Sequence, residues 1–283
     1  MRGCTALAGA LVALSLIPGA ARAADARVAA LQVGLRAQGV YAGSVDGLRG
    51  PATASGVRRL LARAALPVDG VAGPATRRAL GWRGRPALGA RPVRLGRRGW
   101  DVAAVQFMLA RAGFPSGAFD GVAGPHVAAA LRRYQAWAGL PADGVAGPQT
   151  LGRLGAPPPV SPLALRSPVS APIGDGFGPR GDRFHSGVDF VAPAGAPVTA
   201  AGPGCVTFAG GDDGYGSLVV IAHGGGVTSW YAHLSRIDAP RGRCLAGGGR
   251  VGAVGATGRA SGPHLHFEVR VRGAATDPRR ALR

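Results

Sequence analysis

The sequence contains no lysine and no asparagine, so all 33 of its basic residues are arginines. We interpret this bias as a coding preference and not as a sign of function. Against 14 acidic residues it leaves a formal net charge of +19, which favours an anionic partner. Nucleic acid, acidic lipid and an anionic cell wall all fit this charge, so the charge alone does not choose among them.

Long apolar segments are also scarce. After residue 23 no segment is long and apolar enough to span a bilayer. Before it, Arg2 precedes an apolar run over 6–17, and Ala21-Arg22-Ala23 fits a small-x-small cleavage site. This pattern predicts a secretory signal peptide over 1–23, with an uncleaved signal anchor as the alternative. We therefore expect a secreted, extracytoplasmic protein with no stable membrane insertion after signal cleavage.

Cysteine is rare, with three residues in the chain. Signal cleavage would remove Cys4 and leave Cys205 and Cys244 in an exported, oxidising setting. A disulfide between these two is predicted for that setting. Two buried free thiols are the alternative, because the sequence alone does not show whether the geometry permits a bond.

An internal repeat with a constant offset of 74 residues organises positions 25–155, and the six residues of 69–74 recur unchanged at 143–148. Apolar stripes at helical spacing, such as Val28, Leu31 and Leu35, indicate short helices. Prolines tolerated in a first helical turn mark where several of them begin. We predict two small all-α repeats of three helices each, over 25–81 and 93–155.

The composition changes again after the second repeat. Residues 156–167 form a Pro-rich linker, which predicts a stiff tether that keeps the flanking parts apart but close. From 168 to 283, short β-rich runs alternate with clusters of Gly and Pro. The predicted fold class is therefore multidomain, with two three-helix repeats followed by an all-β domain built on an antiparallel sheet.

Five residues of the all-β region suggest its chemistry: His185, Asp189, His233, His264 and His266. Side chains alternate between the two faces of a strand, so residues two or four apart share a side. Catalytic zinc usually has three ligands from such residue types and leaves one position for water. Five candidates exceed that need, so the pattern predicts a metal site with catalytic imidazoles beside it.

Three nearby residues have secondary interpretations. Glu268 follows His266 by two positions and is predicted to hydrogen-bond a ligand histidine, with a role as fourth metal ligand as the alternative. His223 is predicted to be a structural histidine at the end of a strand. Arg180 is a candidate for positioning substrate or organising the site.

The region 170–272 resembles the lysostaphin-type zinc metallopeptidases, the glycyl-glycine endopeptidase family that cuts peptides in peptidoglycan. The matching segments are 177–180, 185–190, 192–193, 215–216, 231–234, 255–258 and 261–268. The resemblance implies that His185, Asp189 and His266 bind Zn²⁺. It implies catalytic roles for His233 and His264 beside the open coordination position. Which of these two is the general base stays open.

Both repeats resemble the three-helix peptidoglycan-binding domain of cell-wall hydrolases, on the Leu-Gln and Val-Gln pairs at 31–32 and 105–106 and on the D-G-x-x-G-P turns. The second copy, with Tyr134-Gln135, is closer to the family pattern than the first, which has Leu60-Leu61 there. The resemblance implies that residues 25–155 bind glycan strands, most clearly through the second copy. Helical spacers without a ligand are the alternative.

The predicted function is that of a secreted zinc metalloendopeptidase that hydrolyses peptide bonds in peptidoglycan stems or cross-bridges through a metal-activated water. A non-catalytic, cell-wall-binding regulator of another hydrolase is the alternative, and the presence of all five site residues argues against it. A nucleic-acid partner is not expected, because aromatic residues do not interleave with the basic positions and the signal peptide directs export.

Overall fold

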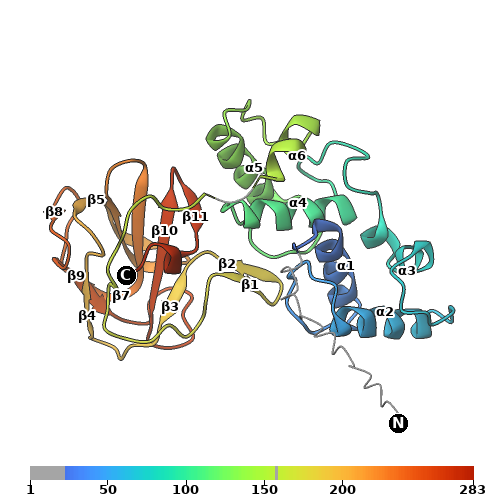
Figure 1. Cartoon of the computed structure of the whole chain (residues 1–283), viewed down its shortest axis with the longest axis horizontal. Coiled ribbons are helices and arrows are strands. Elements are labelled where there is room, and N and C mark those ends of the chain that lie inside the picture. The colour runs from blue at the N-terminus through green and yellow to red at the C-terminus, as the bar shows by residue number, and fades with distance from the viewer. Residues whose placement is uncertain (1–22, 157–158) are drawn as a thin grey trace, which may run out of the picture.

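The computed structural model describes residues 23–156 and 159–283 (Figure 1). The predicted signal peptide thus lies almost entirely outside the described residues. Helices form the N-terminal part and an antiparallel sheet forms the C-terminal part, which confirms the predicted fold class. Among the described residues, no helix has the length and the apolar character needed to cross a membrane.

Each repeat folds as three helices. The first contains α1 (Ala26–Ala37), α2 (Pro51–Arg63) and α3 (Pro74–Ala79), with the 3-10 turn η1 (Gly81–Gly84) after them. The second contains α4 (Trp100–Arg111), α5 (Pro125–Trp137) and α6 (Pro148–Leu154). α2, α3, α5 and α6 begin at the expected prolines, where the missing N–H would have had no partner within the helix.

A buried glutamine side chain ties a D-G turn to its helix in both repeats. Gln32 Nε2 donates to Asp46 Oδ1 over 2.7 Å, and Gln32 Oε1 accepts from the backbone N–H of Gly47 over 2.9 Å. The same pair of bonds recurs twice in the second repeat. It joins Gln106 to Asp120 and Gly121, and Gln135 to Asp143 and Gly144.

The burial of these side chains bears on one sequence difference between the repeats, Tyr134-Gln135 against Leu60-Leu61. Tyr134 and Gln135 are each only 1% exposed, so they stabilise the second repeat and cannot touch a bound wall polymer. Leu60 and Leu61, their counterparts in the first repeat, are buried in its apolar core. The exchange therefore alters packing and not the surface, so it gives no reason to expect weaker ligand binding by the first copy than by the second.

The C-terminal domain is built on a nine-stranded antiparallel sheet, within the described residues. Its central order is β11-β10-β7-β6-β5-β8, with β3 paired to β10 and with β9 between β7 and β4. The strands are β3 (Val188–Phe190), β4 (Pro197–Thr199), β5 (Gly204–Asp212), β6 (Gly216–Ala222), β7 (Val227–Ile237), β8 (Cys244–Leu245), β9 (Arg250–Val254), β10 (Leu265–Val271) and β11 (Ala274–Thr276). A separate hairpin of β1 (Gly178–Arg180) and β2 (Arg183–His185) precedes them, and the 3-10 turn η2 (Pro278–Arg280) follows.

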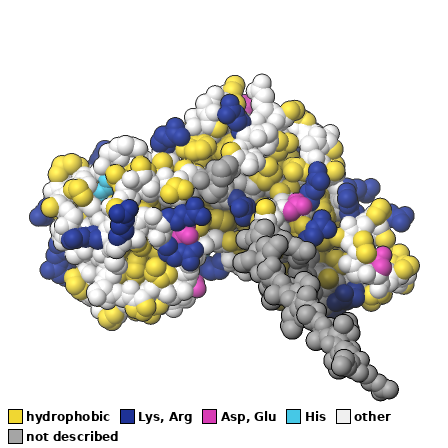
Figure 2. Space-filling view, viewed as in Figure 1, with side chains coloured by type: hydrophobic (Ala, Val, Ile, Leu, Met, Phe, Trp, Pro, Cys, Tyr) yellow, Lys and Arg dark blue, Asp and Glu magenta, His cyan; other side chains and the backbone are white. Residues whose placement is uncertain are grey.

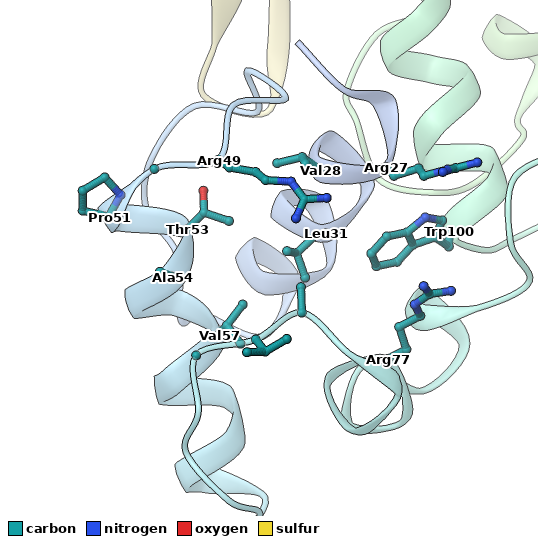
Figure 3. A pocket seen from close by; sticks show the side chains of 14 residues that line it. Arg27, Val28, Leu31, Arg49, Pro51, Thr53, Ala54, Val57, Arg77 and Trp100 are labelled. Carbon is teal, nitrogen blue, oxygen red and sulfur yellow. The ribbon is translucent and has the colours of Figure 1, made fainter. Parts of the chain in front are cut away.

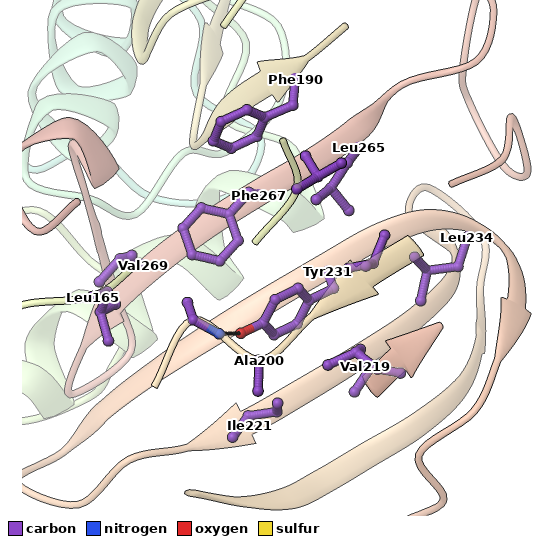
Figure 4. Close-up of a cluster of buried hydrophobic side chains, with 14 of the residues drawn as sticks. Leu165, Phe190, Ala200, Val219, Ile221, Tyr231, Leu234, Leu265, Phe267 and Val269 are labelled. Atoms are coloured by element: carbon purple, nitrogen blue, oxygen red, sulfur yellow. Dashed lines mark hydrogen bonds between the residues drawn. The ribbon is translucent and has the colours of Figure 1, made fainter. Parts of the chain in front are cut away.

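Aromatic and branched side chains fill the interior of this sheet (Figure 4). Tyr231 is fully buried among them, beside Phe267 and Leu234. Its hydroxyl accepts hydrogen bonds from the backbone N–H of Ala201 and the hydroxyl of Ser229, both over 2.8 Å. A buried phenol without such partners would be costly, so these bonds make the tyrosine compatible with the core. Cys205 and Cys244 form the predicted disulfide between β5 and β8.

The helical and β parts are in direct contact. The turn of the β1–β2 hairpin bonds to both repeats: Val45 N–H donates to the carbonyl of Gly181 over 2.8 Å, and Phe119 N–H donates to the carbonyl of Asp182 over 2.7 Å. Phe184 packs against the core that α1 and α4 share. The expected separation of the two parts by a Pro-rich tether is therefore wrong, because the hairpin bridges them (Figure 1).

Candidate metal centre

The three predicted metal ligands converge at one end of β10. His266 on β10 lies directly opposite Asp189 on β3 in the antiparallel register. His185 ends β2, and one ligand atom from each of the three residues lies within 4.8 Å of the others. All three side chains are buried. The structure thus brings together three residues from three different strands, as the sequence pattern predicted.

Hydrogen bonds on the far side of each ring orient the two histidines. His185 Nδ1 donates to the carbonyl of Gly176 over 2.8 Å, which leaves its Nε2 as a lone-pair acceptor facing Asp189 Oδ1 at 3.0 Å. His266 Nε2 lies 3.0 Å from a carboxylate oxygen of Glu268, and its Nδ1 faces Asp189 Oδ1 at 2.8 Å. Ligand histidines usually donate their second ring N–H in this way.

The electrostatics of the cluster favour an added positive charge. Burial opposes charge on His266, but its hydrogen bonds to Asp189 and Glu268 outweigh burial and raise the pKa of the imidazole to about 9. Burial would raise the pKa of Asp189, yet the hydrogen bonds from His185 and His266 hold it well below its ordinary value. Two imidazole nitrogens and a carboxylate that converge in a buried volume can act together as ligands of a divalent cation, whose charge balances theirs.

His233 and His264 lie beside this cluster and line the same groove, which has a volume of about 460 Å³. Their ring centroids are 4.8 Å apart, and His264 Nε2 lies 3.8 Å from Asp189 Oδ1. Each ring donates from Nδ1 to a backbone carbonyl, His233 to Thr257 over 2.7 Å and His264 to Gly262 over 2.9 Å. Both Nε2 atoms therefore carry lone pairs that can accept a proton.

The backbone at His233 is strained. Its φ is +60°, in the left-handed region that non-glycine residues rarely adopt. The position is held because its N–H donates to the carbonyl of Tyr215 over 2.8 Å and because the pairing of β7 with β6 and with β9 shifts register close by. Strain of this kind is often found at functional sites. Burial also lowers the pKa of His233, which favours the neutral imidazole.

Arg180 also lines the groove. Its guanidinium pairs with Asp175 over 2.9 Å and with the second oxygen of Asp189 over 3.2 Å. More than half of the arginine side chain is exposed to solvent. The sequence suggested Arg180 as a residue that positions substrate or organises the site. The structure places its charge at the groove, next to a predicted metal ligand.

A buried hydrogen-bond network contacts the ring nitrogen of His266 that faces away from Asp189. Glu268 has 0% exposure and accepts hydrogen bonds from Ser186 and Tyr215 as well as facing His266. Burial would raise the pKa of Glu268, but the adjacent Arg270 guanidinium, 2.6 Å away, outweighs it and holds the pKa well below its usual value. The predicted hydrogen bond between Glu268 and His266 is present, and the role of His266 as a metal ligand stays a prediction.

Sequence reasoning missed Arg270. Its guanidinium lies 3.7 Å from the ring centroid of Trp230 and donates to Tyr215 over 2.9 Å. Arg270 follows Glu268 by two residues on β10, so the alternation of side chains along a strand was the signal that could have found it. His223, in contrast, bonds to the carbonyl of Pro203 and to Ser229 just after β6, which confirms its prediction as a structural residue.

The Glu268→Gln substitution is expected to weaken zinc binding by about 10–100-fold, because it removes the charge that orients and polarises His266. It should also destabilise the fold by about 3–5 kcal/mol, because Arg270 would lose its buried partner. Competition with a chelator and denaturant unfolding measure the two effects. Asp213→Asn, an equal charge change at an exposed position, is the control, and unchanged zinc affinity in the Glu268 variant would contradict the assignment.

Known protein families match both parts of the chain. Residues 183–278 match Peptidase family M23, and residues 24–80 and 98–154 each match the family described as "Putative peptidoglycan binding domain". Residues 183–278 form an M23 peptidase domain. The predicted resemblance, a lysostaphin-type peptidase domain that follows two peptidoglycan-binding domains, is thereby confirmed. The M23 segment contains all five predicted site residues.

Curated relatives are similar to this chain over part of their length. DD-carboxypeptidase/endopeptidase Mpg of Neisseria meningitidis is 47% identical over 96 residues, 34% of this chain and 22% of that protein. Peptidoglycan DD-endopeptidase ShyA of Vibrio cholerae is 41% identical over 97 residues, 34% of this chain and 23% of that protein. The chain therefore spans less than a quarter of the length of these relatives. Among solved structures, the catalytic domain of lysostaphin from Staphylococcus simulans is 33% identical with a TM-score of 0.37, over 38% of this chain and 90% of that chain.

Proposed function

We propose that this protein is an exported zinc metalloendopeptidase that hydrolyses peptide bonds in peptidoglycan. The observation that carries the proposal is the convergence of two imidazoles and one carboxylate, beside a groove that two further imidazoles line. The relatives named as DD-endopeptidases make the cross-link between D-amino acids the first bond to test. The basic surface, with arginines over both parts of the molecule (Figure 2), suits a substrate polymer that carries carboxylates.

His185, Asp189 and His266 would hold the zinc ion. Their donor atoms are of the types that zinc prefers, and three protein ligands leave a position open, as in catalytic rather than structural sites. Zinc, when bound, supplies Lewis-acid activation of water and of the scissile carbonyl. Glu268 supports the centre through His266, and its own oxygens are already engaged by Ser186, Tyr215 and Arg270. We therefore do not assign it as a fourth ligand.

His233 and His264 would carry the proton transfers. Each holds its Nδ1 proton on a backbone carbonyl, so each Nε2 is free to accept a proton at the groove and to deliver it to the leaving amine. A neutral imidazole can accept a proton in one step and deliver it in the next. Arg180 would position the substrate, because its partly exposed guanidinium faces the same groove.

The proposal is tested with the purified mature chain and a soluble cross-linked muropeptide dimer. We expect zinc-dependent conversion of the dimer to monomers, identified by mass spectrometry, with loss of cleavage in a chelator and recovery on adding zinc. A regulator of another hydrolase would instead bind wall material and release no fragments on its own. That outcome, obtained with a fully zinc-loaded preparation, would overturn the enzymatic proposal.

A further inference from the structure

A groove of about 660 Å³ opens on the first repeat (Figure 3). Its floor is apolar and comes from α1 and α2, with Val28, Leu31 and Val57 among the lining residues. The loop 70–72 forms one wall. Trp100, the first residue of α4, also lines the groove although it belongs to the second repeat. This volume is typical of a ligand site.

The equivalent groove of the second repeat is covered by the chain itself. The backbone N–H of Ala146 donates to the carbonyl of Val93 over 2.8 Å, and the N–H of Val93 donates back over 3.2 Å. Ala123 is likewise bonded to the segment 96–97. Ala123 and Ala146 are the counterparts, 74 residues on, of the groove residues Arg49 and Ala72. Val93 is only 1% exposed, so residues 93–97 occupy the space that, among the described residues, is open on the first repeat.

The sequence suggests why one groove is covered and the other is open. By the offset of 74, the counterparts of residues 93–97 are residues 19–23. These are the last residues of the predicted signal peptide, and cleavage after Ala23 would remove them from the mature chain. The mature first repeat would therefore lack any segment equivalent to the one that covers the second.

Three arginines, Arg27, Arg49 and Arg77, line the open groove (Figure 3). All three are exposed, and within the described part of the chain none of them forms an ion pair with an acidic side chain.

Their counterparts in the second repeat are Asp101, Ala123 and Leu151. Asp101 is fully buried and pairs with Arg91, next to the covering segment, over 2.8 Å. The positive charge is thus not required by the three-helix fold.

The second repeat completes the groove. Trp100 is 7% exposed and packs in the core shared by α1 and α4, so its ring is held in a fixed position at the groove. The guanidinium of Arg77 lies 5.6 Å from the centroid of that ring, within the range of a cation–π contact. The site therefore requires both repeats to be docked together.

We propose that the two repeats form a single ligand site, this groove, and that it binds the acidic stem peptide of peptidoglycan through the carboxylates of that peptide. The inference rests on the proposed cell-wall function and deepens it. Guanidinium groups bind carboxylates through paired, charge-assisted hydrogen bonds. The apolar floor suits small aliphatic side chains of a peptide. An uncharged glycan chain would give the three arginines no partner. The second repeat contributes to the site by holding Trp100 in place at the groove.

The test compares two double variants of the full mature chain at moderate salt, which screens long-range charge effects. Arg49→Gln with Arg77→Gln alters the groove. Arg94→Gln with Arg153→Gln removes the same charge from exposed positions outside it. Binding is measured by calorimetry with three probes: a free stem tetrapeptide, the same peptide with its carboxylates amidated, and a chito-oligosaccharide.

We expect the groove variant to bind the free tetrapeptide about 10–100-fold more weakly than the unaltered chain, and the control variant to bind it equally well. The amidated peptide should bind the unaltered chain weakly. Equal losses in both variants, or tight binding of the chito-oligosaccharide, would overturn the inference. Cleavage of the soluble dimer is assayed in the same preparations and reports separately on the peptidase, so cleavage without groove binding would refute this inference alone.

Discussion

The His185→Ala substitution is expected to abolish zinc binding and peptidase activity together. The remaining candidates, Asp189 and His266, give two protein ligands where catalytic zinc sites use three. Loss of a supporting residue alone usually weakens metal binding by about 10–100-fold, so loss of a ligand should exceed about 100-fold. Zinc content by elemental analysis and turnover of the muropeptide dimer measure the two effects.

A matched control comes from His223, which lies in the same domain and, within the described residues, bonds to Pro203 and Ser229 and does not line the groove. His223→Ala should keep its zinc and its turnover, and a thermal unfolding measurement in parallel should register the loss of its two hydrogen bonds. Stoichiometric zinc and full activity in His185→Ala would show that the ligand assignment is wrong.

The second large effect separates catalysis from metal binding. His233→Ala and His264→Ala should each retain zinc, because His185, Asp189 and His266 remain. Turnover should still fall by about 10²–10⁴-fold, the usual contribution of a general acid or base. Steady-state kinetics on the soluble dimer, with zinc measured in the same samples, test both statements.

His264 and His266, which lie two residues apart, are predicted to have different roles, and metal retention in their alanine variants compares them directly. His266→Ala should lose metal, because its Nδ1 faces Asp189 at 2.8 Å, whereas the nearest His264 nitrogen lies 3.8 Å from the same oxygen. Zinc retained in His266→Ala and lost in His264→Ala would reverse the two roles.

The local features of this protein were predictable because they depend on short-range rules. Alternation along a strand predicted that His264 and His266 share a side, and proline at a first helical turn predicted where α2 and α5 begin. The family resemblance, not the spacing, supplied the separate roles of the five site residues. The comparisons leave those roles untested, and they remain proposals.

What the sequence did not reveal depends on contacts between distant segments. Burial of Tyr134 and Gln135 could not be distinguished from ligand contact, because a family pattern records residues needed for folding together with residues needed for binding. The covering of one groove by residues 93–97, and the docking of the hairpin turn on both repeats, likewise depend on tertiary packing that no local pattern encodes.

The β1–β2 hairpin has a consequence for the intact cell wall. Its turn is bonded to both repeats, and its last residue is His185, so one short hairpin joins the helical part to the metal centre. If the groove of the first repeat holds a stem peptide, the distance from that anchor to the bond being cut is set by the fold. An anchored molecule would then reach only cross-links at one spacing from its attachment point, and the gaps that it opens in a wall would follow a regular pattern.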